Sequence, residues 1–316
     1  MTRIAVLDDY QQVALTLGDW ARIPGDAEVV AFADHVAEPD ALVARLAGFD
    51  VVVMMRERTP LPKPVIDRLD ARLIVTTGLR NAALDVDAAT ARGIVVSGTM
   101  GAITPTSELT WGLILAVARN IPAEDARIRA GGWQGSVGTG LAGKTLGVVG
   151  LGNLGALVAR VGRAFGMHVV AWSQNLTVER AEAAKVELVT KEELFARADV
   201  VTIHLVLSDR TRGLVGEKEL RAMKPSAILV NTSRGPIVDE HALRDALTEG
   251  WIAGAGLDVF DEEPLPAEHP LRNAPRTVLT PHVGYVSDDC YRIFYDEIVE
   301  DIAAFVSGTP IRVLGA

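Results

Sequence analysis

The chain is most constrained by short apolar runs that alternate repeatedly with helix-forming stretches. In the N-terminal third these runs are mostly apolar throughout, without alternating polar positions: RIAVLDD, AEVVAFA, FDVVVMM, ARLIVTTG and GIVVSG. Such runs are typical of strands buried on both faces, and the helical stretches between them are typical of βαβ units. This part of the sequence therefore predicts a parallel sheet covered by helices.

A second series of the same kind occupies the rest of the chain, with the runs KTLGVVG, HVVAWS, VVTIHLV, AILVNTS, AGAGLDV and TVLTPHV. The length of 316 residues also fits about two domains. We expect the boundary near residue 100. Beyond it a long helix is predicted from Thr104 as N-cap, with Pro105 in its first turn, to Asn120, followed by a short helix after Pro122.

The composition limits which partners the protein can bind and which cellular compartment it fits. The formal charge is −10, and Lys and Arg form no runs, so we expect no nucleic-acid partner. Cys290 is the only cysteine, which fits a reducing compartment. Because the sequence shows neither a signal segment nor a long apolar run, we expect a cytoplasmic protein that does not bind a membrane.

The stretch GVVGLGNLGALVAR places Gly150, Gly152 and Gly155 in G-x-G-x-x-G spacing, after an apolar run and at the start of a helical stretch. In this context the first glycine permits a tight turn and the second lets a pyrophosphate approach the backbone. The third lets the helix pack closely on the strand. Free N–H groups at the helix start attract phosphates. The stretch therefore predicts a dinucleotide site.

The next strand should end in an acid that binds the ribose 2′-hydroxyl. Here that position is Ser173, followed by Gln174 and Asn175, and the first acid is Glu179. A carboxylate would repel a 2′-phosphate, whereas these side chains would not, and Arg180 could assist one. We expect NAD(H) or NADP(H), with the preference unresolved. The alternative is a polar turn that contacts nothing.

Two further side chains follow apolar runs, where strand ends face the ligand crevice of a doubly wound sheet. Arg234 has the donors to bind a carboxylate, although it could instead cap a helix or pair with Asp239 or Glu240. His282 is the best candidate for a general acid or base, although a lone histidine is often structural. The six histidines form no metal-binding pattern, so we expect no metal.

Taken together, several long motifs resemble the D-isomer-specific 2-hydroxyacid dehydrogenase family over nearly the whole chain: GLGNLG, HLVLSDRTRGLV, MKPSAILVNTSRGPIVDEHAL, AGLDVFDEEPLP and LTPHVGY. The resemblance implies an α/β fold of two doubly wound parallel-sheet domains with a cleft between them. Residues 1–100 plus 286–316 would form a flavodoxin-like substrate domain, and residues 101–285 a Rossmann cofactor domain. It also implies a homodimer joined through the cofactor domains.

The resemblance implies a catalytic set of Arg234, Glu263 and His282. In the reduction of a 2-oxo acid such as glyoxylate, hydroxypyruvate or a longer one, His282 paired with Glu263 would protonate the developing alkoxide. Arg234 would bind the substrate carboxylate and polarise the carbonyl. The neighbouring acids Asp261, Glu262 and Glu268 match no functional position and are expected to be solvated.

The same matching implies further contacts. The residues expected at the cofactor, besides the three glycines, are Thr77, Asn153, Leu154, Ser173, Gln174, His204, Val206, Thr232, Ser233, Asp258 and Gly284. The backbone N–H groups of Thr77, Gly78 and Leu79 are expected to hold the substrate carboxylate. Arg56, Arg58 and Arg80 could add a second anion contact or could be surface arginines, so the identity of the acid stays open.

Two alternatives remain at this point. Formate or phosphite oxidation occurs on the same fold, but the formate branch pairs its histidine with glutamine, where this chain has Glu263. A dinucleotide-sensing scaffold without activity is disfavoured by the complete catalytic set, although scaffold relatives can retain that set.

Overall fold

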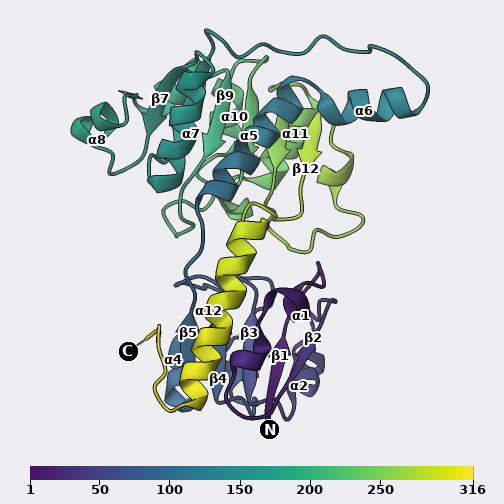
Figure 1. Cartoon of the computed structure of the whole chain (residues 1–316). Coiled ribbons are helices and arrows are strands. Elements are labelled where there is room, and N and C mark those ends of the chain that lie inside the picture. The colour runs from purple at the N-terminus through teal and green to yellow at the C-terminus, as the bar shows by residue number, and fades with distance from the viewer. Residues whose placement is uncertain (316) are drawn as a thin grey trace. The chain divides into compact units, whose positions relative to one another are not determined.

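The computed structural model describes residues 1–315 and divides the chain into two compact units (Figure 1). The first unit comprises Met1–Ala102 and the chain from Val286 onward, and the second comprises Ile103–Tyr285. The second unit is therefore inserted between the two pieces of the first.

The first unit contains a five-stranded sheet in the order β2-β1-β3-β4-β5, in which every pairing is parallel. Its strands are β1 Thr2–Val6, β2 Ala27–Ala31, β3 Val51–Met54, β4 Leu73–Thr76 and β5 Val95–Gly98. Its helices are α1 Ala14–Leu17, η1 Trp20–Arg22, α2 Pro39–Leu46, α3 Lys63–Ile66, α4 Val86–Ala91 and α12 Asp288–Val306.

The central strands of this sheet are buried on both faces, as their uniform apolarity predicts. All four residues of β3 and all four of β4 are buried. The C-terminal helix α12 covers part of the sheet and buries Phe294, Ile298 and Ile302 along one face. The chain after α12 then pairs with the edge strand β5 at Ser97 and Val313.

The second unit contains a seven-stranded parallel sheet in the order β12-β11-β10-β9-β6-β7-β8. Its strands are β6 Thr145–Val149, β7 His168–Trp172, β8 Glu187–Leu188, β9 Val200–Ile203, β10 Ile228–Asn231, β11 Gly254–Leu257 and β12 Thr277–Leu279. The short strand β8 lies at the edge and was not predicted from the sequence.

Helices cover both faces of this sheet (Figure 1). They are α5 Thr104–Ala118, α6 Ile121–Arg129, α7 Asn153–Ala164, α8 Val178–Ala183, α9 Lys191–Arg197, α10 Glu217–Ala222 and α11 Glu240–Thr248, with the 3-10 turns η2 Gly235–Ile237 and η3 Pro270–Asn273. One apolar core contains residues of α5 and α7, and the other contains residues of α9, α10 and α11.

The predicted start and end of α5 were wrong by one or two residues. Ile103 already has helical backbone angles, so Thr104 is the first residue inside the helix and its side chain caps nothing. At the other end Asn120 adopts a left-handed conformation with φ of 52°, which stops α5 before Pro122 enters the first turn of α6.

The strand order of the second unit determines where a ligand can bind. From β6 the chain passes first to β7 on one side of it and later to β9 on the other. In open parallel sheets the crevice outside the carboxyl ends of the strands, at this reversal, is the usual ligand site. Since all strands of the sheet are parallel, the segments after β6, β7, β9, β10, β11 and β12 emerge at this same edge.

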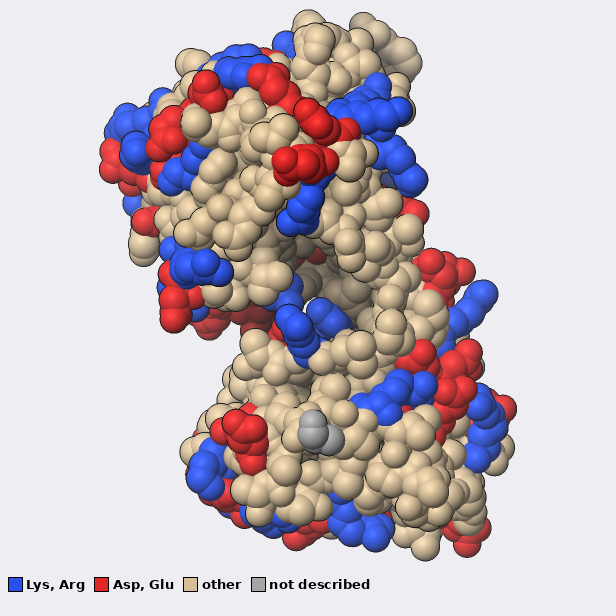
Figure 2. Space-filling model, turned by 90° about the vertical axis from the view of Figure 1, so that its left-hand side faces the viewer, with Lys and Arg blue, Asp and Glu red and all other residues tan. Residues whose placement is uncertain are grey.

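The surface mixes both signs of charge. Figure 2 shows Lys and Arg side chains interspersed with Asp and Glu over the visible face, without a continuous basic area. Among residues 1–315, every helix is too short or too polar to cross a bilayer.

Candidate active site

The glycine turn follows β6 at the reversal of strand order. Gly150 has φ of +100°, and a Cβ there would lie 2.5 Å from the carbonyl oxygen of His204. A Cβ at Gly155 would lie only 2.1 Å from the carbonyl oxygen of Gly150. A Cβ at Gly152 would have no neighbour within 4 Å. Two of the glycines are thus required by the packing of the protein itself, and Gly152 leaves space above the turn.

The start of α7 is open to an anion. Gly152 is the N-cap residue, and no side chain of the described part of the chain caps this end. The first helical residues are Asn153 and Leu154, whose N–H groups lie in the first turn and therefore lack intrahelical partners. The helix runs for 12 residues, so these N–H groups and the helix dipole together favour a phosphate.

Ser173 lies directly beside the glycine turn. The N–H of Gly150 donates to the carbonyl of Trp172 over 2.8 Å, which brings the residue after β7 next to the turn. Ser173 is half-buried, and Gln174 is exposed. The structure therefore brings Ser173, the residue predicted at the ribose, next to the glycine turn.

His204 and Val206 follow β9 on the other side of the turn. The Nε2 of His204 lies 2.9 Å from the Thr202 hydroxyl, and its Nδ1 is buried without a hydrogen-bond partner among residues 1–315. Burial lowers the pKa of His204 to about 3, so the ring is neutral. Val206 is 81% exposed and offers apolar surface at the same edge of the sheet.

Arg234 is held by a short network after β10. The side-chain amide of Asn231 donates to the Arg234 carbonyl over 2.9 Å and accepts from the Ser233 N–H at 3.0 Å. The Arg234 guanidinium donates to the Ser233 carbonyl at 2.7 Å. Asp239 caps α11, and Glu240 lies 3.2 Å from the Nε2 of His269. Both acids that could have paired with Arg234 thus have other partners.

Thr232 and Ser233 use their hydroxyl groups inside the protein. The hydroxyl of Thr232 lies 2.8 Å from that of Thr110 in α5. Ser233 donates its hydroxyl to the carbonyl of Ile203 at 2.9 Å. These hydrogen bonds fix the segment after β10 to α5 and β9. A hydrogen bond from either hydroxyl to a cofactor would therefore have to be shared with them.

Glu263 and His282 meet directly. The Nδ1 of His282 lies 2.6 Å from a carboxylate oxygen of Glu263, whose other oxygen accepts the N–H of Phe260 at 2.9 Å. The backbone of Phe260 in turn packs on Gly235, where a Cβ would lie 2.1 Å from it. This packing brings the Arg234 segment against the loop that carries Glu263.

Asp258 holds the turn that carries His282. The residue is 1% exposed. Its carboxylate accepts hydrogen bonds from the Thr280 hydroxyl at 2.6 Å and from the N–H groups of Val283 and Gly284 at 2.9 and 2.8 Å. Burial raises the pKa of Asp258 above its ordinary value, although these hydrogen bonds favour the charged form. Its observed role is to fix the backbone on both sides of His282.

Three residues of this neighbourhood were missed by the sequence reasoning. Thr280 bonds Asp258, the Thr106 hydroxyl donates to the Gly284 carbonyl at 3.0 Å, and the ring of Tyr285 stands edge-on to His282 with centroids 5.7 Å apart. Thr280 and Tyr285 lie within three residues of His282, which is the one signal that could have identified them. Thr106 is distant in sequence and carried no signal.

The Thr77–Leu79 segment belongs to the first unit and follows β4. The Thr77 N–H donates to the Met54 carbonyl and the Gly78 N–H to the Thr99 hydroxyl, at 3.0 and 3.2 Å. Thr77 is fully buried, and its hydroxyl accepts the Arg56 N–H at 2.8 Å. Two of the three N–H groups expected to bind substrate therefore already have protein partners, whereas Leu79 is 47% exposed.

The three arginines near this segment differ. Arg58 donates to the Asp8 carbonyl at 2.6 Å and to the Tyr291 hydroxyl at 3.3 Å, and is therefore a structural side chain. Arg56 lies over Gly78, where a Cβ would meet its guanidinium at 2.1 Å. Arg80 is exposed.

Within residues 1–315 no three side chains of His, Cys, Asp or Glu gather in a way that could hold a metal ion. The acids Asp261, Glu262 and Glu268 are exposed, as expected from the sequence.

Comparison with known proteins adds two findings. Residues 111–284 match the sequence model described as D-isomer specific 2-hydroxyacid dehydrogenase, NAD binding domain. A glyoxylate reductase of Thermococcus litoralis is 42% identical over 235 residues, which cover 71% of each protein.

Two more relatives extend the match. A D-3-phosphoglycerate dehydrogenase of Methanocaldococcus jannaschii is 38% identical over 274 residues, which cover 85% of this chain and 52% of that protein. The crystal structure of a phosphoglycerate oxidoreductase from Vibrio cholerae O395 superposes with a TM-score of 0.93 at 35% identity and covers 98% of this chain and 100% of that one.

Proposed function

This chain belongs to the D-isomer-specific 2-hydroxyacid dehydrogenase family and is therefore an NAD(P)-dependent oxidoreductase that interconverts 2-oxo and 2-hydroxy acids. We propose that Arg234, Glu263 and His282 carry out the reaction. The observation that carries this proposal is the 2.6 Å contact between His282 and Glu263, beside the Arg234 segment at the carboxyl edge of the sheet.

The glycine turn fits a dinucleotide. Gly152 leaves open space where any side chain would intrude, and the uncapped first turn of α7 offers N–H groups to a pyrophosphate. When bound, the nicotinamide ring supplies a hydride to the carbonyl carbon or accepts one from the hydroxy acid. We assign the pyrophosphate to the N–H groups of Asn153 and Leu154, the adenosine to the surface around His204 and Val206, and the nicotinamide half to the segments around Thr232 and Gly284.

Arg234 binds the carboxylate of the substrate. Its backbone is fixed by Asn231 and its guanidinium is anchored on the Ser233 carbonyl, so its position is set before substrate arrives. A guanidinium presents parallel donors that match a carboxylate, and the same charge stabilises negative charge that develops on the carbonyl oxygen.

His282 exchanges the proton. Because Glu263 holds Nδ1, Nε2 is the ring nitrogen that faces the substrate oxygen. In the reductive direction Nε2–H gives its proton to the oxygen as the carbon receives the hydride, and the carboxylate of Glu263 stabilises the charged ring meanwhile. In the oxidative direction the neutral ring takes the hydroxyl proton.

The substrate is a small 2-oxo acid, such as glyoxylate, hydroxypyruvate or a longer or phosphorylated one. The relatives named above are a glyoxylate reductase and a D-3-phosphoglycerate dehydrogenase. We propose that the exposed end of the Thr77–Leu79 segment contributes a backbone donor to the substrate. The guanidinium of Arg56, which lies over Gly78, is the candidate for a second anion contact.

The experiment is a panel of 2-oxo acids, with formate and phosphite as comparison substrates, each assayed with both nicotinamide cofactors at the nicotinamide absorbance. We expect turnover of one or more 2-oxo acids above that of formate or phosphite. Absence of turnover on every 2-oxo acid would contradict the proposed function.

We propose that the second unit forms a homodimer through its arm, defined as residues 121–140, which comprises α6 and the following loop. Helix α6 buries none of its residues. Large apolar side chains of the arm are exposed, with Ile128 at 53%, Trp133 at 73% and Val137 at 97%. Large exposed apolar side chains gathered on one segment support an interaction surface, and a self-complementary contact between two copies closes the assembly.

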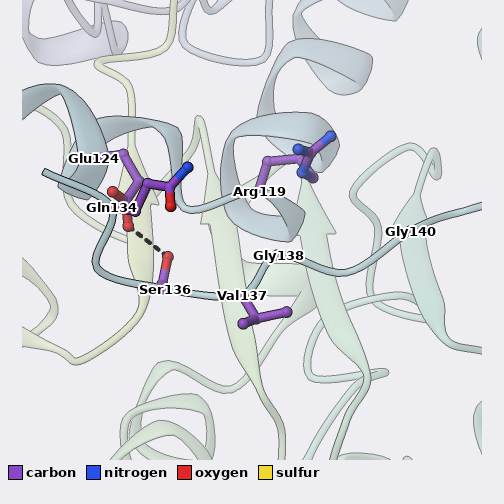
Figure 3. A pocket seen from close by; sticks show the side chains of 7 residues that line it. All are labelled: Arg119, Glu124, Gln134, Ser136, Val137, Gly138 and Gly140. Carbon is purple, nitrogen blue, oxygen red and sulfur yellow. Dashed lines mark hydrogen bonds between the residues drawn. The ribbon is translucent and has the colours of Figure 1, made fainter.

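The arm also encloses a surface hollow of about 610 Å³ (Figure 3). Glu124 of α6 accepts the hydroxyl of Ser136 at 2.6 Å across the arm, and Arg119 lines the other side of the hollow. This hydrogen bond holds the loop to the helix, so the arm presents a defined shape to a second copy.

A further inference from the structure

Two side chains flank the first two residues of the glycine turn. Ser173 follows β7, whose last carbonyl accepts the Gly150 N–H at 2.8 Å. From α8, the guanidinium of Arg180 donates to the carbonyl of Leu151 at 3.4 Å. Figure 1 shows α8 next to the end of β7. A serine and an arginine thus stand on the side of the turn where the adenosine ribose of a dinucleotide lies.

No carboxylate occupies this position. A turn closed by the bond from Leu176 N–H to the Ser173 carbonyl, 3.0 Å long, exposes the neutral side chains of Gln174 and Asn175. The first acid is Glu179, and its carboxylate is engaged by its own N–H and by the Thr177 hydroxyl at the start of α8. The charged side chain with a hydrogen bond to the backbone of the glycine turn is therefore an arginine, not an acid.

We propose that the enzyme prefers NADP(H) to NAD(H), with the Arg180 guanidinium binding the 2′-phosphate and Ser173 leaving room for it. This inference rests on the proposed function because it concerns the cofactor that binds at the same dinucleotide site. An acid at position 173 would repel the phosphate, whereas the serine hydroxyl can donate to it. The fork of donors on arginine suits a phosphate dianion.

The test compares dissociation constants for NADPH and NADH, measured by calorimetry on the full chain. We expect the wild type to bind NADPH at least about tenfold more tightly than NADH, as one charge-assisted contact allows. Arg180→Met should weaken NADPH binding about tenfold and change NADH binding less than about threefold. Ser173→Asp should reverse the preference. Arg160→Met, which removes an exposed arginine from α7 in the same unit, serves as the matched control and should change neither constant.

A second probe separates this inference from the proposed reaction. Adenosine 2′,5′-bisphosphate and adenosine 5′-monophosphate carry only the ribose end of the cofactor, so their binding does not depend on turnover. Tighter binding of the bisphosphate, lost in Arg180→Met, supports the inference even if every 2-oxo acid fails as substrate. Equal binding of the two nucleotides by the wild type overturns the inference even if the enzyme reduces 2-oxo acids.

Discussion

His282 occupies a backbone conformation that few residues adopt. Its φ is +54°, in the left-handed region where non-glycine residues are uncommon. Three hydrogen bonds to the Asp258 carboxylate secure the residues around it, from Thr280, Val283 and Gly284. Unusual backbone angles persist when the surroundings over-determine them, and they gather at functional sites. The arrangement aims the ring at Glu263 before any substrate binds.

The substitution His282→Asn tests the role of the ring. Asparagine tolerates a positive φ better than most residues, so the turn should keep its shape and the cofactor should still bind. Loss of the acid–base group should lower kcat by about 10²–10⁴-fold. Steady-state rates and cofactor titrations on the variant provide the measurement. The matched control is His241→Asn, an exposed histidine in the same unit; a His282→Asn enzyme as fast as that control would remove the ring from the mechanism.

At the scale of single elements, two glycines of the turn from β6 to α7 have different roles. Gly155 is pressed against the carbonyl of Gly150, whereas Gly152 has open space beside its Cα. Gly155 is needed so that the helix can pack closely on the strand. Gly152 is needed so that a dinucleotide can approach the turn.

We therefore expect Gly155→Ala and Gly152→Ala to fail in different ways. The added methyl at 155 would overlap backbone, so the thermal unfolding temperature should fall by several degrees, as overpacking by about 1–3 kcal/mol predicts. The methyl at 152 meets no protein atom, so stability should be unchanged while dinucleotide affinity falls at least about tenfold. Thermal unfolding and cofactor titration of both variants measure the two effects; equal stability of the two proteins would contradict this interpretation.

Most strands of both sheets were predictable because a strand that is buried on both faces appears in the sequence as an uninterrupted apolar run. Runs such as VVVM and LIVT, now β3 and β4, can only be interior strands or helix segments, and their length decides. The strand β8 has two residues, Glu187 and Leu188, and lies at an edge, so neither length nor apolarity identifies it. The short helices α1 and α3 have four residues each and leave no periodic pattern.

Those site residues that directly follow a strand of the parallel sheet could be placed from the sequence. Arg234 and His282 follow parallel strands, so the topology alone brings them to one edge of the sheet. The pairing of Glu263 with His282 came from resemblance. The internal partners of Thr77 and Gly78 were not predictable, because their hydrogen bonds go to Met54 and to Thr99, in other segments of the first unit.

At the scale of the whole molecule, the C-terminal segment closes the first unit around a buried acid. Asp301 of α12 is 0% exposed, and one of its oxygens accepts from Arg312 at 2.9 Å. Its other oxygen has no hydrogen-bond partner among residues 1–315. Burial raises the pKa of Asp301 to about 7 in spite of the arginine, so much of the population carries the neutral acid at neutral pH.

This raised pKa predicts how stability depends on pH. An unfolded aspartate has a pKa of about 3.9, so between about pH 4 and pH 7 the folded protein binds more protons at Asp301 than the unfolded chain does. The free energy of unfolding should therefore fall as pH rises through this window, by up to about 4 kcal/mol, because the two pKa values differ by about three units. The amide in Asp301→Asn mimics the neutral acid and should remove this slope.

Unfolding midpoints at pH 5, 6, 7 and 8 for wild type and Asp301→Asn provide the measurement. The control Asp288→Asn alters an exposed acid of the same helix and should leave the slope as it is in the wild type. Parallel pH profiles for wild type and Asp301→Asn would show that Asp301 titrates normally.

The arm predicts the oligomeric state. With Ile128→Glu and Trp133→Glu combined, we expect the dimer to dissociate to a species of 33.7 kDa, because each new carboxylate would have to be buried in an apolar contact. Light scattering after size-exclusion chromatography gives the mass. Val178→Glu, which charges an equally exposed valine of α8 outside the arm, should remain dimeric; a monomeric wild type would contradict the assignment of the arm.

The insertion of one unit into the other has a consequence for how the protein is made. A ribosome delivers residues 1–102, then the whole inserted unit, and only then the chain from Val286 onward. At about 5–20 residues per second that delay lasts roughly ten to forty seconds. Throughout it, the sheet surface that α12 will cover stays bare on the nascent chain, and at its end the inserted unit has all its residues while the first unit still lacks α12. Biosynthesis therefore completes the middle of this protein before its beginning, and the early segment must be kept from aggregation until the last residues arrive.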